Sequence, residues 1–225
     1  MAAGGAAVVL VDRDEDGLRK TEEEIAGAGG VCRVQTIDLG ESGAPARVIE
    51  HAVGQFGALS IVVHSAGVHE QAPFAAMTAE AFDRVFAVNV RAPYFLTQHC
   101  LPHLAPGSSV LFIGSTGAIA AIPGGFSAYC ATKGAVHSLM RALAVELAPY
   151  QVRVNELVPG AFDTPLNAAA FSKDPALEEG IIRGTPLARL GEPDDIVAPA
   201  LFLVSEGARH VHGASIVIDG GFTIL

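Results

Sequence analysis

The chain has 225 residues; half of them are hydrophobic, 17% are charged, and the formal net charge is −10 at pH 7. A chain of this length and composition can bury a substantial core, which excludes an intrinsically disordered protein. The acidic balance argues against nucleic acid, an anionic membrane surface or an acidic carrier protein as a partner.

The three cysteines, Cys32, Cys100 and Cys130, show no C-x-x-C spacing, and this sparse, odd set predicts a reducing cytoplasm without disulfides. No apolar run reaches the roughly 18 residues that a membrane-spanning helix needs. The N-terminus lacks a basic region followed by an apolar core, so no signal peptide is expected. We therefore expect a cytoplasmic protein.

Short apolar runs of strand length alternate with segments of helical periodicity along the chain. The first helix is expected to begin at Asp14, as its N-cap, and to end at Gly29. The expected strands are residues 6–11, 31–37, 59–64, 109–114, 152–158 and 215–218. The expected helices are residues 14–28, 49–56, 78–104, 126–148 and 193–205, and residues 162–189 form a loop with one or two short helices.

This repeated alternation predicts a parallel sheet covered by helices on both faces. The expected fold class is α/β: a Rossmann-like, doubly wound parallel sheet in three α/β/α layers. No internal repeat, low-complexity segment or linker interrupts the pattern. We therefore expect one domain over residues 1–225.

The strand at residues 6–11 matches the second strand of a dinucleotide-binding unit. In such a unit an acidic residue at that strand end lies ~20 residues beyond a glycine-rich phosphate loop and binds the adenosine ribose. Asp12 occupies such a strand end, and only 11 residues precede it. The first strand, the glycine-rich loop and most of the first helix are therefore expected to be missing. The strands at 6–11 and 59–63 would then have unpaired edges, as in a shortened version of a longer protein.

Tyr129 and Lys133 are four residues apart in a predicted helix and therefore share one face. An ammonium near a phenol favours the phenolate, so Lys133 is expected to lower the pKa of Tyr129. Tyr129 would then serve as an acid and base in alcohol–carbonyl interconversion. The alternative interpretation of this short motif is a surface pair.

Two further side chains extend the candidate site. Ser115 follows a predicted strand, where a hydroxyl points into the crevice that binds ligands in parallel sheets. Asn89 lies in an apolar helical stretch, and Pro93 cannot donate a backbone hydrogen bond to the Asn89 carbonyl, so a kink is expected there. A free carbonyl beside a buried amide could hold an ordered water; the alternative is an asparagine that only supports the kink.

With these motifs the chain resembles the short-chain dehydrogenase/reductase family over residues 6–221. The family's Tyr-x-x-x-Lys falls on Tyr129 and Lys133, and its asparagine falls on Asn89. Family spacing of thirteen residues before the tyrosine selects Thr116 as the catalytic hydroxyl. The sequence Gly114-Ser115-Thr116-Gly117 favours Ser115, with one extra residue in the loop before Phe126.

The resemblance implies roles for these residues on an NAD(P) cofactor. Ser115 and Tyr129 bind the substrate oxygen, Lys133 also binds the nicotinamide ribose, and Asn89 holds a water that relays protons. The family's Asn-Asn-Ala-Gly appears here as His64-Ser65-Ala66-Gly67, which replaces both amides. The implied cofactor-binding residues are Asp12, Asp38, Leu39, Ser65, Ala66, Gly67, Tyr129, Lys133, Pro159, Gly160, Phe162 and Thr164.

The sequence thus predicts an oxidoreductase that interconverts a secondary alcohol and a ketone. Asp12 would repel a 2′-phosphate, so NAD is favoured over NADP, although Arg13 could soften the preference. Two alternatives are a 3-oxoacyl-carrier-protein reductase-like enzyme and a non-catalytic subunit that acts by association. Family members commonly assemble through the helices at 78–104 and 126–148, which implies a homo-oligomer, a tetramer or a dimer. The pair His210 and His212 lacks a third ligand, and no metal site is expected.

Overall fold

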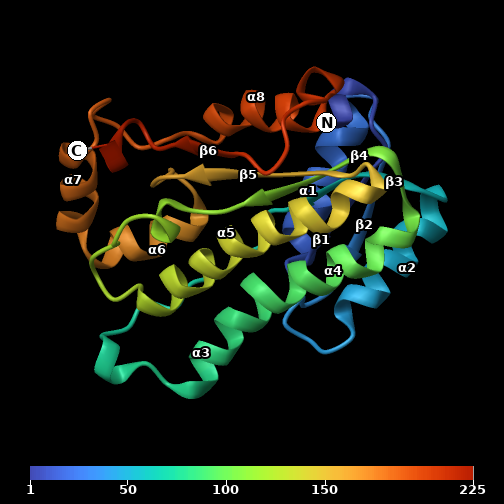
Figure 1. The fold of residues 1–225 in the computed structure, drawn as a ribbon. Helices are drawn as coiled ribbons and strands as arrows, with labels where there is room; N and C mark the ends of the chain where they lie inside the picture. Colours follow the sequence, from blue (N-terminus) through green and yellow to red (C-terminus); the bar gives the residue numbers. More distant parts are fainter. Residues whose placement is uncertain (225) are drawn as a thin grey trace.

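The computed structural model describes residues 1–224, apart from the side chains of Ala169 and Lys173. Strands and helices alternate through most of this part of the chain (Figure 1). The strands are β1 (Val8–Asp12), β2 (Cys32–Thr36), β3 (Leu59–His64), β4 (Leu104–Ile113), β5 (Arg153–Pro159) and β6 (Ser215–Ile218). The helices are α1 (Glu15–Gly27), α2 (Ala44–Phe56), α3 (Ala79–Phe86), α4 (Ala92–Cys100), α5 (Ser127–Leu147), α6 (Pro165–Lys173), α7 (Pro175–Gly184) and α8 (Pro193–Val204).

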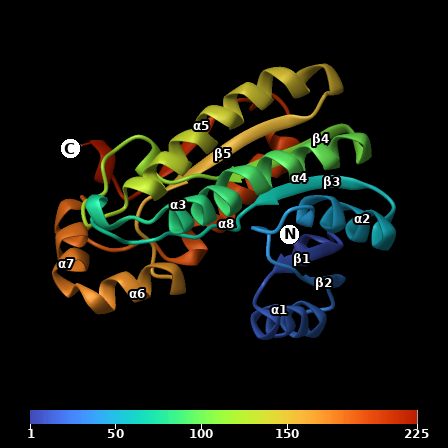
Figure 2. The ribbon, with the colours of Figure 1, turned by 90° about the horizontal axis from the view of Figure 1, so that it is seen from below.

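All strand pairs in the described residues are parallel, as expected. They form two sheets: β1 pairs with β2, and the other four strands follow the order β3-β4-β5-β6. Strands β1 and β3 therefore each have one unpaired edge in the described chain, at the two places that the sequence predicted. Seen from below, β1, β2 and α1 lie together beside β3, whereas α6 and α7 lie at the opposite end (Figure 2).

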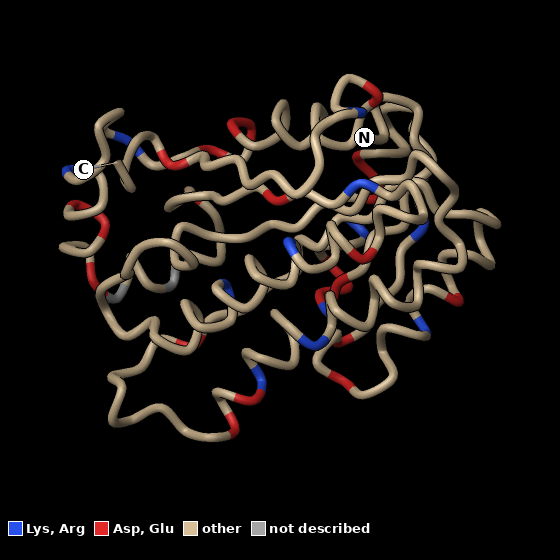
Figure 3. Tube along the Cα trace, in the orientation of Figure 1, with Lys and Arg blue, Asp and Glu red and all other residues tan. Residues whose placement is uncertain are grey.

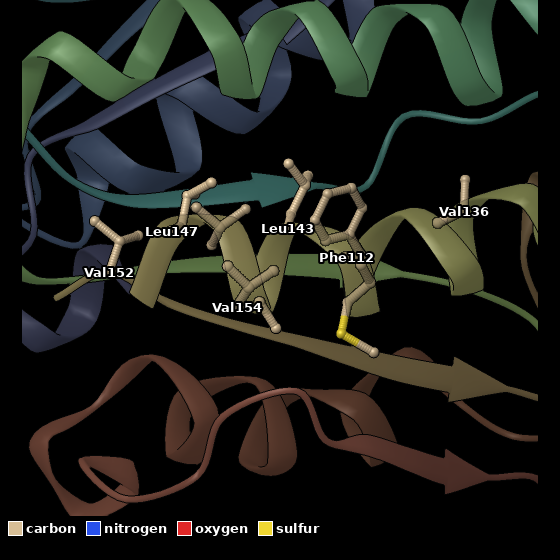
Figure 4. Close-up of a cluster of buried hydrophobic side chains, with 9 residues drawn as sticks. Phe112, Val136, Leu143, Leu147, Val152 and Val154 are labelled. Atoms are coloured by element: carbon tan, nitrogen blue, oxygen red, sulfur yellow. The ribbon is translucent and has the colours of Figure 1, made fainter. Parts of the chain in front are cut away.

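Helix α5 covers one face of the larger sheet because its apolar residues recur at helical spacing. Val136, Met140 and Leu143 pack on Phe112 of β4 and Val154 of β5 in a closely packed cluster (Figure 4). Each of these side chains is at most 8% exposed. This packing fixes the position of α5 and therefore of the tyrosine and lysine near its N-terminus.

The opposite face of the sheet is covered by α8, where Leu203 packs on Leu111 and Leu157. A third cluster lies under α2 and α4 and joins the two sheets, since it includes Val11 of β1 and Val62 of β3. The predicted three-layer α/β/α arrangement is confirmed for the larger sheet, with α8 on one side and α4 and α5 on the other (Figure 1).

Two local predictions were wrong, on the helix over 78–104 and on the start of the strand at 109. The helix expected over 78–104 is divided by a π-helical turn at Ala87–Arg91, where the Ala92 N–H donates to the Ala87 carbonyl five residues back. Asp14 is the N-cap residue of α1, as predicted, but its side chain makes no capping bond, and its backbone N–H donates to Asp12 Oδ1. Strand β4 begins five residues before the expected start, because Leu104 pairs with Leu59 across a register irregularity.

Charged residues lie mostly outside the larger sheet (Figure 3). Strands β3, β4 and β6 contain no Asp, Glu, Lys or Arg, whereas β5 carries Arg153 and Glu156. Among the described residues, no helix combines the length and the apolarity that crossing a bilayer requires. Of these two residues only Glu156 is fully buried within the sheet.

Candidate active site

Three elements bring the predicted catalytic side chains together. Ser115 lies two residues after the end of β4, Tyr129 and Lys133 lie in the first two turns of α5, and Asn89 lies on the π-helical turn. The α5 pair faces the sheet because positions i and i+4 share one side of a helix. The alternative of an exposed surface pair is therefore wrong: Lys133 is only 6% exposed.

The ammonium of Lys133 is fixed beside the end of β4. Its Nζ donates a hydrogen bond of 2.8 Å to the carbonyl oxygen of Ile113. Burial disfavours the charged form and lowers the pKa of Lys133 to about 8, and the negative charge of Glu156 partly opposes this shift. Lys133 is therefore a cation held in a nonpolar environment at neutral pH.

The pKa of Tyr129 corrects a prediction from the sequence. Burial of the phenol raises this pKa above its usual value, and a hydrogen bond from the Ser115 hydroxyl opposes the increase only in part. The expected lowering by Lys133 is not found, because Nζ is bonded to Ile113 and lies 5.6 Å from the centre of the tyrosine ring. In this arrangement Tyr129 is neutral and can donate a proton.

The contact with Tyr129 distinguishes between the two candidate hydroxyls. Ser115 Oγ accepts a hydrogen bond of 3.1 Å from the Gly117 N–H and also interacts with the Tyr129 phenol. Thr116 is buried and lies along the same cavity, but no contact of its hydroxyl with Tyr129 is found in the described structure. The geometry thus places Ser115, the residue favoured from the sequence, beside the tyrosine.

The side-chain amide of Asn89 is fully engaged with backbone and side-chain partners. Its Oδ1 accepts from the Val68 N–H at 2.9 Å, and its Nδ2 donates to the Val68 carbonyl at 2.8 Å and to Thr132 Oγ1 at 3.0 Å. Asn89 therefore joins the loop after β3 to α5. This arrangement fits the alternative in which Asn89 supports the local fold rather than holding a water.

A cavity of about 900 Å³ opens in front of Ser115, Tyr129 and Lys133. It extends from the end of β1, where Asp12 contributes to its wall, to the segment after β6. The other predicted cofactor residues along it are Ser65, Ala66, Gly67, Pro159, Gly160, Phe162 and Thr164.

Two predicted cofactor residues lie away from this cavity. The Asp38 carboxylate accepts the Gly40 N–H at 2.8 Å and pairs with Arg84 at 3.2 Å, and both interactions lower the pKa of Asp38. Leu39 packs against the cluster beneath α2 and α4. The structure therefore does not bring Asp38 and Leu39 to the cavity wall.

His69 is a cavity residue that the sequence analysis missed. Its ring lies edge-on to Tyr129, with the ring centres 6.0 Å apart, and its Nε2 is 2.8 Å from the Leu166 carbonyl oxygen. His69 connects the loop after β3 to the start of α6 and lines the cavity beside Tyr129. Its position five residues after a strand end was the available signal, since such loops form the ligand crevice.

The pair His210 and His212 was not predicted to bind metal. His212 uses both ring nitrogens within the fold: Nδ1 accepts from the Val154 N–H, and Nε2 lies 2.6 Å from the Ala144 carbonyl. It therefore joins β5 to α5.

The cavity suits a dinucleotide in size and in its chemical groups. Its volume lies in the range of ligand and cofactor sites, and it joins an exposed carboxylate, Asp12, to a buried ammonium, Lys133. A carboxylate at a strand end is a typical ribose ligand, and Lys133 Nζ can donate further hydrogen bonds beyond the one to Ile113.

Comparison with known proteins decides the family. A family model described as enoyl-(acyl carrier protein) reductase matches residues 1–223. The chain belongs to the short-chain dehydrogenase/reductase family. As a member of this family it is an oxidoreductase, and the family binds nicotinamide cofactors.

Individual relatives agree with this assignment. An uncharacterized oxidoreductase of Methylorubrum extorquens is 36% identical over 222 residues, which is 98% of this chain and 89% of that protein. L-rhamnose 1-dehydrogenase (NAD(P)(+)) of Azotobacter vinelandii is 32% identical, over 99% of this chain and 89% of the relative. A gluconate 5-dehydrogenase from Burkholderia cenocepacia, solved with NADP and tartrate, has a TM-score of 0.90 and 28% identity, covering 100% of this chain and 88% of the other.

The comparisons leave one sequence prediction open. Because the family model matches from residue 1, they do not show the missing first strand and glycine-rich loop. That absence stays a prediction, as do the roles of the individual site residues.

Proposed function

We propose that this short-chain dehydrogenase/reductase interconverts a secondary alcohol and a ketone with NAD as the preferred cofactor. The observation that carries the proposal is the placement of Tyr129, Ser115 and Lys133 in the wall of one cavity that also reaches Asp12. The family membership supports an oxidoreductase over a non-catalytic subunit.

Each residue has a distinct role in this proposal. Ser115 and Tyr129 bind the substrate oxygen, and Tyr129 donates a proton to a ketone or accepts the hydroxyl proton of an alcohol. Lys133 binds the nicotinamide ribose through the hydrogen bonds that Nζ can still donate. Asn89 holds the loop after β3 in register with α5 through its bonds to Val68 and Thr132. When bound, the nicotinamide supplies or accepts the hydride.

Asp12 is the basis for the proposed preference for NAD. Its exposed carboxylate would bind ribose hydroxyls and repel a 2′-phosphate. Arg13, its neighbour, offers a positive charge that would reduce this discrimination. A structural relative was solved with NADP, so the fold itself does not exclude the 2′-phosphate and the proposed preference rests on Asp12 alone.

The cavity wall in front of Tyr129 favours an apolar substrate. Ile122, Phe126, Leu166 and Phe171 face this space from the loops and helices around it. Such a wall fits cyclic or aliphatic alcohols better than highly charged ones. Three of the polar groups in this wall, Ser115, Tyr129 and His69, would orient the reacting oxygen.

We also propose a cytoplasmic homo-oligomer. Exposed aromatic and aliphatic residues lie on the two helices that the family resemblance assigns to assembly: Tyr94 and Phe95 on α4 are 45% and 39% exposed, and Val145 on α5 is 76% exposed. Apolar side chains with this exposure on adjacent helices mark a protein contact surface. Light scattering that finds only monomer would contradict this proposal.

The first experiment is a calorimetric titration of the 225-residue chain with NADH and, separately, with NADPH. Micromolar binding of NADH that exceeds NADPH binding is expected, and an Asp12→Ser variant should lose that preference. Failure of the folded chain to bind either nucleotide would refute cofactor use by this chain and favour the predicted loss of the glycine-rich loop.

Turnover on a panel of cyclic and aliphatic secondary alcohols then tests the chemistry. Tyr129→Phe should lower kcat by at least about 100-fold, because the proton donor is lost, while the variant still binds NADH through the other cofactor-binding residues. Tyr150→Phe is the matched control, since Tyr150 is 54% exposed beyond the end of α5. Turnover that survives Tyr129→Phe would refute the mechanism.

A further inference from the structure

Glu156 is a buried carboxylate behind the candidate active site. It is 0% exposed, and it lies on β5 among Val154 and Val158, which are also fully buried. Its Oε2 atom accepts hydrogen bonds from His137 Nδ1 at 2.7 Å and from Ser215 Oγ at 2.8 Å. Its Oε1 atom has no hydrogen-bond partner among the described residues. An ionised carboxylate in such a place is costly unless a positive charge lies near it.

Helix α5 provides that charge through a line of side chains on one face. Tyr129, Lys133 and His137 follow one another at intervals of four residues, so all three face the sheet. His137 holds the carboxylate from one end of this line, and its side chain is 25% exposed. Lys133, one turn closer to the tyrosine, experiences the negative charge of Glu156 directly.

The backbone before Ser115 leaves room for the carboxylate. Gly114 lies against Glu156 so closely that a Cβ atom at this position would be only 2.1 Å from Oε1. The preceding residue, Ile113, provides the carbonyl that binds Lys133 Nζ. Glu156 thus lies against the strand end that carries both the lysine's hydrogen-bond acceptor and the catalytic hydroxyl.

We propose that Glu156, held by His137 and Ser215, is a positioning residue that keeps Lys133 protonated while Tyr129 exchanges its proton with the substrate. The proposal rests on the function proposed above for Tyr129 and Lys133. Removing the carboxylate would leave a buried ammonium with only a neutral carbonyl acceptor, and desolvation would then favour the neutral amine. Loss of that charge would weaken ribose binding.

The other ionisable groups around Lys133 are few. Tyr129, Cys130 and His137 lie on its own helix, and His69 lies against Tyr129 from the loop after β3. Asp12, Arg189 and Asp219 lie along the cavity. Of the carboxylates in the described chain, Glu156 is the one whose charge acts on the pKa of Lys133. Burial is the larger influence on the pKa of Lys133, and Glu156 opposes it, so the effect of Glu156 is measured as the difference between the wild type and an uncharged variant.

The test is a direct NMR titration of Lys133 in protein labelled with 13C at the lysine Cε atoms. The chain has only the lysines Lys20, Lys133 and Lys173, so Lys20→Arg and Lys173→Arg variants assign the signal of Lys133. Glu156→Gln should lower the pKa of Lys133 by about 1 unit or more relative to the wild type. Glu146→Gln, the same change at an exposed position of α5, is the matched control and should leave this pKa unchanged.

Two measurements, the NMR titration and the pH dependence of kcat, separate this inference from the proposed function. The NMR titration needs no turnover, so a folded but inactive chain refutes the function and still tests Glu156. If the chain is active, kcat should fall at a lower pH in Glu156→Gln than in the wild type. In Glu156→Asp, which keeps a carboxylate, the pH of this fall should return part of the way to the wild-type value. Should the glutamine variant fail to fold, Glu156→Met has a similar volume and no charge. An unchanged pKa of Lys133 in a folded uncharged variant would overturn the proposal.

Discussion

Asn89 and Val68 exchange two hydrogen bonds, so that one side-chain amide acts on the loop after β3 as a neighbouring strand would. The Asn89 oxygen accepts the Val68 N–H, and the Asn89 nitrogen donates to the Val68 carbonyl. The π-helical turn at Ala87–Arg91 presents this amide, and the third bond, to Thr132, reaches α5. The loop that carries His69 is thereby fixed relative to the helix that carries Tyr129.

Asn89→Ala should therefore reduce the free energy of unfolding by about 3 kcal/mol, because three hydrogen bonds are lost and two backbone groups of Val68 lose their partners. Urea unfolding followed by circular dichroism measures this loss. Asn167→Ala is the control, since the Asn167 amide makes one bond, to the Phe162 carbonyl, and should cost about 1 kcal/mol. Equal losses in the two variants would contradict the role given to Asn89.

His64 should make the protein less stable in acid. Burial lowers the pKa of His64 to about 4, below its usual 6.5, and its Nε2 lies 2.8 Å from Thr97 Oγ1. Since the folded state binds the proton less tightly, the stabilisation is complete above pH 6.5 and is lost as the pH falls toward 4. The loss amounts to about 3 kcal/mol.

The variant His64→Asn, which carries the residue of the family motif, should remove this dependence. Urea titrations at pH 7 and at pH 4 give the free energy of unfolding of each protein. Between these two pH values the wild type should lose about 3 kcal/mol more stability than His64→Asn. A parallel fall in both proteins would mean that His64 does not contribute to acid sensitivity.

Local pattern was sufficient to predict the strand order along the chain and the shared face of Tyr129 and Lys133. Both predictions depend on the periodicity of side chains, which is two residues in a strand and 3.6 in a helix. Packing of α5 on Phe112 and Val154 agrees with the predicted helix. Ser115 could also be predicted, because the end of a parallel strand fixes where a side chain lies. Ser115, Tyr129 and Lys133 all line the same cavity.

The remaining features depend on contacts between distant residues. No local signal shows that Asp38 turns to Arg84, 46 positions along the chain, or that the helix around Asn89 takes a π-helical turn. The direction of the pKa shift of Tyr129 depends on how deeply the phenol is buried, which spacing alone does not give. Glu156 was not identified because its sequence context does not show that its carboxylate lies against Gly114.

Lys133 should make the protein more stable in alkali. Its pKa in the folded state, about 8, lies below the usual 10.5, so its contribution is complete above pH 10.5 and is lost as the pH falls through 8. Relative to Lys133→Met, the wild type should therefore gain about 3 kcal/mol of stability between pH 8 and pH 10.5. Urea titrations across this range measure the difference, with Lys20→Met as the control at an exposed position. A constant difference between wild type and Lys133→Met would show that burial does not shift this lysine.

Gly114→Ala should be strongly destabilising because of Glu156. The added methyl group would lie 2.1 Å from Glu156 Oε1 and 2.8 Å from its Cδ, and neither β4 nor the buried carboxylate can move without breaking other bonds. We expect a loss of about 3 kcal/mol in the free energy of unfolding, together with a loss of activity because Ser115 is the next residue. Gly134→Ala is the control, since no atom lies within 4 Å of the added carbon, and in helix α5 alanine should stabilise by about 0.5–1 kcal/mol.

A double-mutant cycle identifies the cause of the loss. In a Glu156→Ala background the space against Gly114 is empty, so Gly114→Ala should cost about 1 kcal/mol or less, and the coupling energy between the two positions should be about 2 kcal/mol. Denaturant unfolding of the four proteins gives this coupling. If Gly114→Ala costs the same in both backgrounds, strain in the strand end itself causes the loss, and the proposed contact between Gly114 and Glu156 is not what constrains residue 114.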